Sequence, residues 1–193
     1  MYKDSSSQSR YCYPDTDVLI NIPGLRDPNQ LEVYESLVAT QRGSHLHQNP
    51  CLGSFDLKHL KAIHHYIFQD IYPFAGQIRD EDISKGFYFA PSQYILLQAK
   101  EIFRKLREES YLVGLDLEEF SQKAAELMGD INHLHPFREG NGRTQREFIR
   151  CLALRAGYKL DWSRVSTKET LDASIRSVVD DTPLADVIRR CII

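Results

Sequence analysis

The stretch FSQKAAELMGDINHLHPFREGNGRTQREFIRCLALRAG, residues 120–157, decides the fold class. In its first half, apolar residues recur at spacings of three and four, which predicts one buried face of a helix. These residues are Phe120, Ala124, Leu127, Met128, Ile131 and Leu134. A second helix is predicted over 143–156, and Gly157 stands where a helix C-cap favours glycine. Because Pro136 and two glycines interrupt both patterns, the stretch predicts two helices joined by a short loop.

Helical spacing also governs most of the remaining chain. It is found over residues 31–41, 57–71, 92–109, 166–179 and from 182 onward. Ser54 is a candidate N-cap for the second of these helices, and Asp116 with Glu119 resembles a capping box ahead of the central stretch. The segment between Gly43 and Gly53 is predicted to be a loop. Runs in which apolar and polar residues alternate are nearly absent, so the predicted fold class is all-α.

Residues 82–91, DISKGFYFAP, are the exception to this helical pattern. Three aromatic residues at 87–89 follow a glycine, and Pro91 ends the run, which favours a short β-hairpin. Residues 1–17 are polar and Ser-rich and are predicted to be a tail that becomes ordered only by docking. The chain is therefore expected to be a single domain over 1–193, an all-α helical bundle with a short β-hairpin flap.

Length and composition narrow the classes of function. At 193 residues the chain has the size of about one domain and can bury a sizeable core. Its formal net charge of −3 disfavours a basic nucleic-acid-binding protein. The four cysteines lack the spacing of a disulfide framework, and no apolar run approaches the length of a membrane span. We therefore expect a cytoplasmic protein with reduced thiols that binds neither nucleic acid nor a membrane directly.

The loop and helix start over residues 135–146, HPFREGNGRTQR, carry the candidate chemistry. Gly140 and Gly142 permit a backbone whose N–H groups converge at the start of the second helix, and such an arrangement binds phosphate. Arg143 and Arg146 lie three residues apart on the first turn and can add forked contacts to phosphate oxygens. The segment therefore predicts a site for the phosphates of a nucleotide.

The same loop offers a base and a metal ligand. His135 ends the first helix, and an imidazole is largely neutral near pH 7, so it can accept a proton. Glu139 supplies one hard carboxylate, and Mg²⁺ typically takes one or two carboxylates together with substrate phosphates. Transfer of a phosphoryl or nucleotidyl group from a nucleotide to a hydroxyl requires a base, a metal ligand, an anion site and cations, and this loop offers all of them. Each of them alone is more often a turn, a cap or a solvated face, and only their combination favours a catalytic site.

A metal centre made from the remaining histidines and the cysteines is a competing interpretation. The histidines considered for it are His45, His47, His64, His65 and His133. They show no zinc-finger spacing. His64 also falls on the apolar face of its predicted helix, where a core residue is the more common explanation. A function in metal binding is therefore disfavoured.

The HPFREGNGRTQR segment resembles, without a gap, the HxFx[D/E]GNGRxxR signature of the Fic domain family. The resemblance extends over nearly the whole chain and includes FQDIYPFAGQIRDEDISKGFYFAP, residues 68–91. It implies the Fic fold, with residues 82–91 as the flap that clamps a segment of the target protein. It also implies a protein adenylyltransferase, an enzyme that moves AMP from ATP to a Tyr, Ser or Thr hydroxyl of a target protein and releases pyrophosphate.

The resemblance implies a role for each residue of the loop. His135 would deprotonate the target hydroxyl, Glu139 would hold the Mg²⁺ that bridges the α- and β-phosphates, and Phe137 would anchor the loop in the core. Arg143 and Arg146 would grip the β- and γ-phosphates. The residues that would cradle the phosphates are Gly140, Asn141 and Gly142. The flap residues implied to contact the target or the nucleotide are Ser84, Lys85, Gly86 and Phe89.

The resemblance also implies a form of regulation. Fic enzymes are commonly restrained by a helix with the pattern [S/T]xxxE[G/N], whose Glu pairs with the second arginine of the signature, here Arg146. No Ser or Thr of this chain has a Glu four residues later. The chain is therefore predicted to be the toxin of a toxin–antitoxin pair in which a small antitoxin supplies that helix. An inhibitory segment following Ile193 is the alternative.

The resemblance also bears on the target protein and on the kind of group that is transferred. Toxins of this kind modify the ATPase subunits of two bacterial type II topoisomerases, DNA gyrase and topoisomerase IV, so such a subunit is the implied target. Relatives with Lys in place of Gly142 resemble kinases, and the glycine here favours AMP transfer. A Fic-fold kinase, or another nucleotide or phosphocholine transferase, remains the alternative function.

Overall fold

Two helices run through the middle of the protein, α4 (Leu117–Leu134) and α5 (Asn141–Ala156). The apolar stripe predicted on α4 is buried, with Phe120 and Ile131 fully inaccessible to solvent. Phe148 of α5 is equally inaccessible and belongs to the same hydrophobic core. The two central helices and the loop between them therefore have the arrangement that the sequence predicts.

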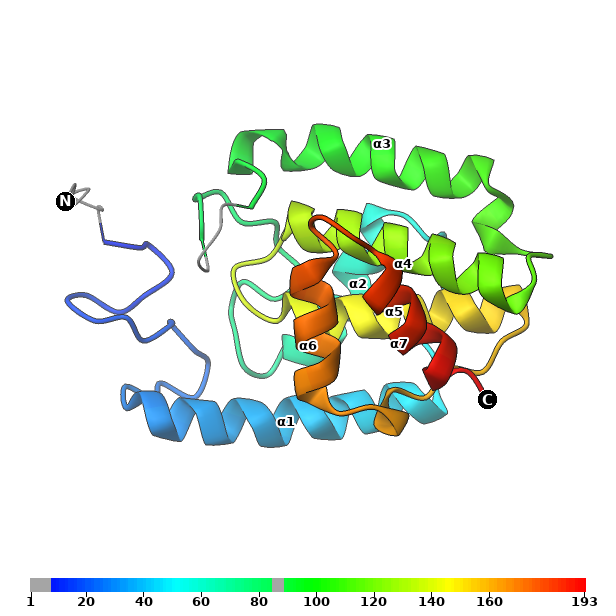
Figure 1. Cartoon of the computed structure of the whole chain (residues 1–193). Coiled ribbons are helices and arrows are strands. Elements are labelled where there is room, and N and C mark those ends of the chain that lie inside the picture. Colours follow the sequence, from blue (N-terminus) through cyan, green and yellow to red (C-terminus); the bar gives the residue numbers. More distant parts are fainter. Residues whose placement is uncertain (1–7, 85–88) are drawn as a thin grey trace.

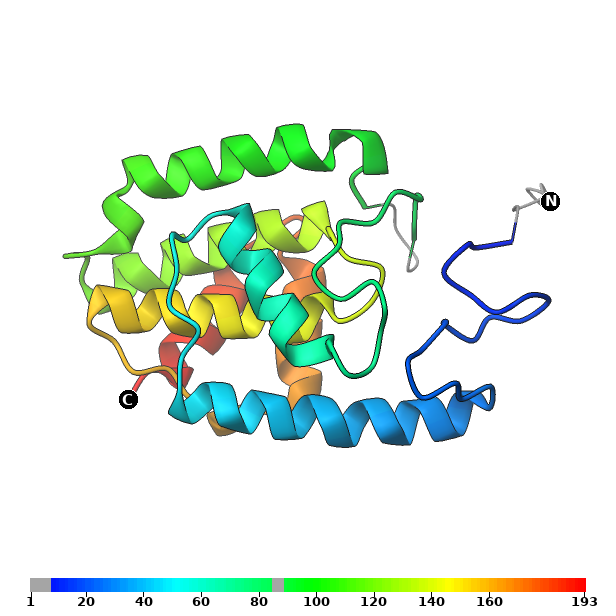
Figure 2. The ribbon, with the colours of Figure 1, turned by 180° about the vertical axis from the view of Figure 1, so that it is seen from behind.

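The structure, a computed structural model, describes residues 8–84 and 89–193. Within these residues five further helices surround the central pair: α1 (Pro28–Gln48), α2 (Leu57–Phe68), α3 (Ile95–Glu108), α6 (Thr167–Arg176) and α7 (Thr182–Cys191). Short 3-10 turns lie at η1 (Ser92–Tyr94), η2 (Ser110–Leu112) and η3 (Trp162–Arg164). Helices α1 and α3 lie on opposite sides of the bundle, and α6 and α7 cover one face of the central pair (Figure 1). Helix α2 covers the other face, as Figure 2 shows from behind. The all-α class is confirmed.

The local signals at the ends of the central helices are confirmed. The carboxylate of Asp116 accepts the backbone N–H of Glu119 at 2.9 Å and caps α4. Gly157 ends α5 with a φ of +95°, the left-handed conformation that favours glycine. Helix α5 begins at Asn141, slightly before the predicted start at residue 143, because Gly140 turns the chain directly into the helix with a φ of +81°.

Helix α1 is longer than predicted, since it continues through Gly43 to Gln48. The prediction of a loop from residue 43 was therefore wrong for its first residues. Leu46 is almost fully buried, and its carbonyl accepts a hydrogen bond from Nη2 of the buried Arg150 at 2.8 Å. This packing outweighs the low helix propensity of one glycine, about 1 kcal/mol relative to alanine.

Two other predicted helices are shorter than expected. The cap of α2 is Asp56 rather than Ser54, because the Asp56 carboxylate accepts the N–H of His59 at 2.9 Å, and the helix ends at Phe68. Helix α6 ends at Arg176, so the predicted helix over 166–179 loses its last turn. Its apolar residues are exposed: Leu171, Ile175, Val178 and Val179. Apolar residues at helical spacing therefore do not show whether that face of the helix packs against another part of the protein.

The described part of the predicted N-terminal tail, residues 8–17, docks on the body of the protein. Tyr11 is buried and packs edge-on against Phe74, with ring centroids 5.2 Å apart. Cys12 forms an antiparallel bridge with Leu19, and the Ser9 hydroxyl donates to the Glu81 carboxylate at 2.6 Å. The packing of Tyr11, the bridge of Cys12 and the hydrogen bond of Ser9 together hold this segment against the body of the protein.

The flap falls partly outside the described residues. Lys85 and Gly86 belong to the segment 85–88 that the structure does not describe, so the hairpin and these two assignments stay predictions. Ser84 is exposed, whereas Phe89 is buried at the other end of the segment. In the described part of the chain, no helix combines the length and the apolar character needed to cross a lipid bilayer.

The cap at the start of α4 can be tested by stability. We expect Asp116→Ala to lower the free energy of unfolding by about 1 kcal/mol, because it removes the acceptor for an N–H group at the helix N-terminus. Urea unfolding monitored by far-UV circular dichroism measures the change. Asp172→Ala removes an exposed carboxylate from α6 and serves as the control with an unchanged midpoint. Equal stability of the Asp116→Ala variant and the unchanged chain would contradict the assignment of the cap.

Candidate active site

His135 stands at the C-terminal end of α4 in an unusual backbone conformation. Its φ of +42° and ψ of 61° are left-handed, which is unfavourable for a residue with a Cβ atom. Its Nδ1 lies 3.2 Å from the carbonyl oxygen of Asn132. A carbonyl only accepts, so Nδ1 carries the proton and Nε2 of the neutral ring keeps a lone pair. The ring is stacked on Phe89 at a centroid distance of 3.6 Å. The structure therefore presents His135 in the tautomer that a general base needs.

Arg79 holds this conformation from the interior. Its side chain is almost fully buried, and its Nε donates to the carbonyl of His135 at 2.8 Å. The same guanidinium donates to the carbonyls of Glu81 at 2.8 Å and Ala90 at 2.6 Å, on either side of the flap. Burial lowers the pKa of Arg79 from its ordinary value. Arg79 thus connects the histidine to both ends of the flap segment. The sequence does not predict this role of Arg79, because a single arginine in a loop forms no recognisable pattern.

Asn141 stabilises the loop rather than facing outward. Its Oδ1 accepts the N–H of Phe137 at 2.9 Å, and its Nδ2 donates to the carbonyl of the same residue at 2.7 Å. Phe137 is buried and stacks on His64 at a centroid distance of 3.9 Å. The implied anchoring role of Phe137 is in keeping with this position. Since the Asn141 side chain is occupied in this way, only its backbone N–H is available to a phosphate.

His64 is a second internal support of the loop. Its Nδ1 accepts the N–H of Gly76 at 2.7 Å, so Nε2 carries the proton and donates to the carbonyl of Glu139 at 2.9 Å. The ring is fully buried, and this burial lowers its pKa to about 4. The interpretation of His64 as a core residue of its helix face is confirmed. The structure adds that the neutral ring fastens the backbone of the loop to α2.

Helix α5 begins directly after Gly140, which has a left-handed backbone conformation. Gly140 has a φ of +81°, and a Cβ atom there would lie 2.3 Å from the ring of Phe68, so no other residue fits. Its N–H donates to Oε1 of Glu139 at 2.8 Å. Among the described residues no side chain caps the N-terminus of α5, and Gly142 in its first turn is exposed. These features fit the predicted anion site, because a helix N-terminus favours negative charge.

The two arginines differ in their surroundings. Arg143 donates to the carboxylate of Glu35 on α1 and lies over the ring of Phe68, 4.7 Å from its centroid. Arg146 is half-buried, and within the described residues no acidic side chain forms an ion pair with it. Partial burial, and next the charge of Arg143, lower the pKa of Arg146. A half-buried cation without an acidic partner in the described part of the chain is a place where an anionic ligand gains from charge pairing.

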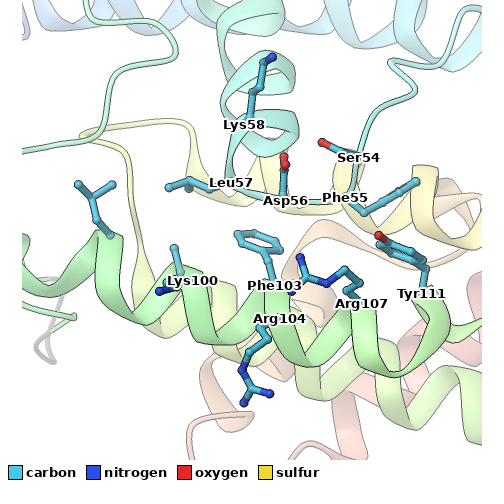
Figure 3. A pocket seen from close by; sticks show the side chains of 12 residues that line it. Ser54, Phe55, Asp56, Leu57, Lys58, Lys100, Phe103, Arg104, Arg107 and Tyr111 are labelled. Carbon is cyan, nitrogen blue, oxygen red and sulfur yellow. The ribbon is translucent and has the colours of Figure 1, made fainter.

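A hollow of about 430 Å³ lies between α1 and these arginines. Its lining comprises Glu32, Glu35, Ser36, Ala39, Thr40, Arg143 and Arg146. A second hollow, of about 440 Å³, lies between the start of α2 and α3 and is lined by Phe103, Arg107 and Tyr111, among others (Figure 3). No residue of the 135–146 segment borders this second hollow.

The donor set of the loop fits a magnesium ion that is shared with a substrate. In the described part of the chain, no three His, Cys, Asp or Glu side chains gather as a metal cage. Glu139 is half-buried at the anion site, and its Oε1 accepts the N–H of Gly140. Mg²⁺ commonly binds through a single carboxylate plus water and substrate phosphates, which is the coordination this site could offer.

Comparisons with known proteins agree with the signature of the loop. Residues 54–153 match the Fic/DOC family. The chain is 44% identical over 191 residues to the protein adenylyltransferase VbhT of Bartonella schoenbuchensis, an alignment that covers 98% of this chain and 40% of that relative. The chain thus spans well under half of VbhT. A probable protein adenylyltransferase of Sinorhizobium fredii is 38% identical, with both chains covered in full. The N-terminal Fic domain of a Bartonella quintana effector with bound ADP has a TM-score of 0.89 at 29% identity, over 95% of this chain and 94% of that chain.

The support from His64 predicts a dependence of stability on pH. Its pKa of about 4 in the folded chain lies below the value near 6.5 expected when unfolded, so the unfolded chain binds the proton more readily. The stabilisation is complete above pH 6.5 and is lost as the pH falls toward 4, by about 3 kcal/mol in all. Urea unfolding at pH 7, 5.5 and 4.5 measures this loss.

A variant without the imidazole isolates the contribution of His64. His64→Gln should lower the stability at pH 7 and flatten its decline between pH 7 and 4.5. His47→Gln, at an exposed position of α1, should keep the original decline. The assignment is wrong if the stability of the His64→Gln variant declines as steeply as that of the unchanged chain.

Proposed function

The chain belongs to the Fic/DOC family, and from this premise we propose that it transfers AMP from ATP to a Tyr, Ser or Thr hydroxyl of a target protein. One observation carries the proposal: His135 with its Nδ1 proton on a backbone carbonyl, a helix N-terminus that no described side chain caps, and Arg146, which has no acidic partner among the described residues, all belong to one loop and the first turns of α5. The names of both similar proteins, protein adenylyltransferases, support this reaction.

The phosphates of ATP bind at the N-terminus of α5 in this proposal. Backbone N–H groups of the first turn, that of Gly142 included, donate to phosphate oxygens. Arg143 and Arg146 extend from the same turn and add charged contacts to the β- and γ-phosphates. Binding supplies the anion that the half-buried Arg146 lacks among the described side chains. The ADP in the similar Bartonella quintana structure supports a nucleotide diphosphate or triphosphate as the ligand.

Proton transfer and bond exchange then follow at His135. Its Nε2 takes the proton from the target hydroxyl, and the resulting oxygen attacks the α-phosphorus of ATP. The new bond joins this oxygen to the α-phosphorus, while the bond from that phosphorus to the oxygen shared with the β-phosphate breaks. Pyrophosphate leaves and AMP remains on the target. The N–H groups at the helix start stabilise the charge that develops on the α-phosphoryl group.

Glu139 is the residue that would hold Mg²⁺. A bound Mg²⁺ would offset the charge of the phosphates and so assist departure of pyrophosphate. The carboxylate is kept in place by the Gly140 N–H and, through its backbone carbonyl, by His64. The protein therefore supplies a fixed carboxylate whether or not the nucleotide is bound.

The flap would align the target hydroxyl by pairing with an extended target segment. Ser84 is exposed at one end of the flap, and Phe89 packs on the ring of His135 at the other. Lys85 and Gly86 remain candidate contacts from the sequence alone. Because Arg79 bonds to both ends of the flap and to His135, a clamped segment would be held in a constant relation to the base.

A small antitoxin is the proposed regulator. Its helix would place a Glu carboxylate on Arg146 and so occupy the position of the γ-phosphate. Support comes from the unpaired state of Arg146 among the described residues and from the similarity to VbhT. A type II topoisomerase ATPase subunit as target, and the cytoplasm as the place of action, rest on the family resemblance and belong to the same proposal.

The role of His135 is tested with labelled nucleotide in a bacterial lysate. With α-³²P-ATP and Mg²⁺ we expect a labelled protein band that His135→Ala reduces at least about 100-fold, because general-base catalysis is lost. His133→Ala, at an exposed position of α4, should keep the band. A band obtained from γ-³²P-ATP and not from α-³²P-ATP would instead establish the kinase alternative.

The contact of Arg146 with the distal phosphates is tested by binding. Arg146→Gln should weaken the affinity for ATP about tenfold more than the affinity for AMP, because AMP lacks the β- and γ-phosphates. Isothermal titration calorimetry measures both affinities. Arg155→Gln, an exposed position on the same helix, is the control. Equal weakening of ATP and AMP would place Arg146 elsewhere in the site.

A further inference from the structure

Glu35 on α1 brings a carboxylate to the loop from a distant part of the chain. Its side chain is only 16% exposed. One carboxylate oxygen accepts from Nη2 of Arg143, and the other accepts from the phenol of Tyr72. The carboxylate therefore has a specific partner at each oxygen, and neither of its two contacts is within its own helix.

Tyr72 fixes the position of the Glu35 carboxylate by a hydrogen bond. Its ring is buried and stacked on Phe74 at a centroid distance of 4.8 Å. Burial, and next the hydrogen bond to Glu35, raise the pKa of Tyr72 far above its ordinary value. The phenol therefore keeps its proton and continues to donate to Glu35. A rigid aromatic side chain thus fixes the carboxylate before any ligand arrives.

Arg143 is consequently held on three sides. Glu35 accepts from its guanidinium, the ring of Phe68 lies below it at 4.7 Å, and Oε1 of Glu139 lies 3.8 Å from Nη2. Arg146, one helical turn further along, has no comparable acidic partner among the described residues. A flexible arginine side chain loses rotamer entropy when it binds a ligand, and Arg143 has already lost much of it.

We propose that Glu35 is a positioning residue that acts through Arg143. Its carboxylate aims the guanidinium at the phosphate site, so that Arg143 meets the nucleotide without reorganisation. This inference rests on the proposed nucleotide site, and it adds a residue outside the loop signature to the machinery that binds the phosphates. Tyr72 supports Glu35 in the same way that Glu35 supports Arg143.

Nucleotide binding without a target protein tests this role independently of transfer. Isothermal titration with ATP and Mg²⁺ compares the unchanged chain with Glu35→Gln, which keeps the size of the side chain and removes its charge. We expect Glu35→Gln to weaken binding about tenfold, the usual effect of losing a group that orients a ligand-binding residue. Tyr72→Phe leaves the carboxylate in place and should weaken binding by a smaller factor.

Glu32→Gln is the matched control for charge. Glu32 lies one helical turn before Glu35, lines the same hollow and is exposed. Its variant removes an equal charge from the same side of the site without touching the contact to Arg143. ATP binding to the Glu32→Gln variant should stay within about twofold of the unchanged chain, because exposed charges act weakly across solvent.

A double-mutant cycle separates positioning from general structural damage. In an Arg143→Gln background, which has no cation for Glu35 to position, Glu35→Gln should cause no further loss of ATP affinity. A tenfold loss in both backgrounds would overturn the proposal and assign Glu35 a general structural role. Tighter ATP binding by Glu35→Gln would overturn it as well, since Glu35 would then compete with phosphate for Arg143.

Two outcomes separate the role of Glu35 from the nucleotide site on which that role rests. If the unchanged chain binds no ATP, both the nucleotide site and the role of Glu35 are overturned. If it binds ATP and Glu35→Gln binds equally well, only the role of Glu35 is overturned. Thermal unfolding of each variant confirms that the affinities compare folded proteins.

Discussion

The hydrogen bond from the buried guanidinium of Arg79 to the carbonyl of His135 is the contact on which the site depends. A left-handed backbone at a residue with a Cβ atom costs about 1–2 kcal/mol, and α4 could otherwise continue or end differently at this point. Arg79 stabilises that conformation and at the same time bonds to Glu81 and Ala90 beside the flap. The direction of the imidazole and the ends of the flap are therefore set by one internal cation, and the loop that follows starts from a fixed point.

After His135, side chains in the interior hold the loop in place by hydrogen bonds to its backbone. His64 takes the carbonyl of Glu139, and the Asn141 side chain closes the turn at Phe137. The two arginines differ in their partners. The charge of Arg143 is compensated by Glu35, whereas the half-buried Arg146 has no acidic partner in the described parts of the chain. A triphosphate, or a carboxylate from a regulator, would supply the charge that Arg146 lacks, so substrate and inhibitor would compete for one cation.

Local patterns predict the parts of this structure that depend on neighbours in the sequence. The apolar stripe of α4, the cap at Asp116 and the glycine that ends α5 all involve groups within a few residues, and all were predicted. The supports of the site were not predicted, because Arg79, Glu35 and Tyr72 reach the loop only through tertiary packing. The continuation of α1 through Gly43 has the same origin, since a buried Leu46 and a distant arginine stabilise it. The exposed apolar side chains of α6 show the converse, in which a helical pattern does not imply a buried face.

We conclude that the loop is preorganised, with the proton of His135 on Nδ1 and a lone pair on Nε2 before any ligand binds. Nitrogen-15 NMR of the histidine side chains in the free protein tests this directly, because the two ring nitrogens have different shifts in each tautomer. Assignment by comparison with the His135→Ala variant identifies the signal. At neutral pH in the absence of nucleotide, we predict that the neutral His135 ring is the Nδ1–H tautomer, as the contact with Asn132 requires. A ring found mainly as the Nε2–H tautomer, or averaging rapidly between the two, would contradict the claim.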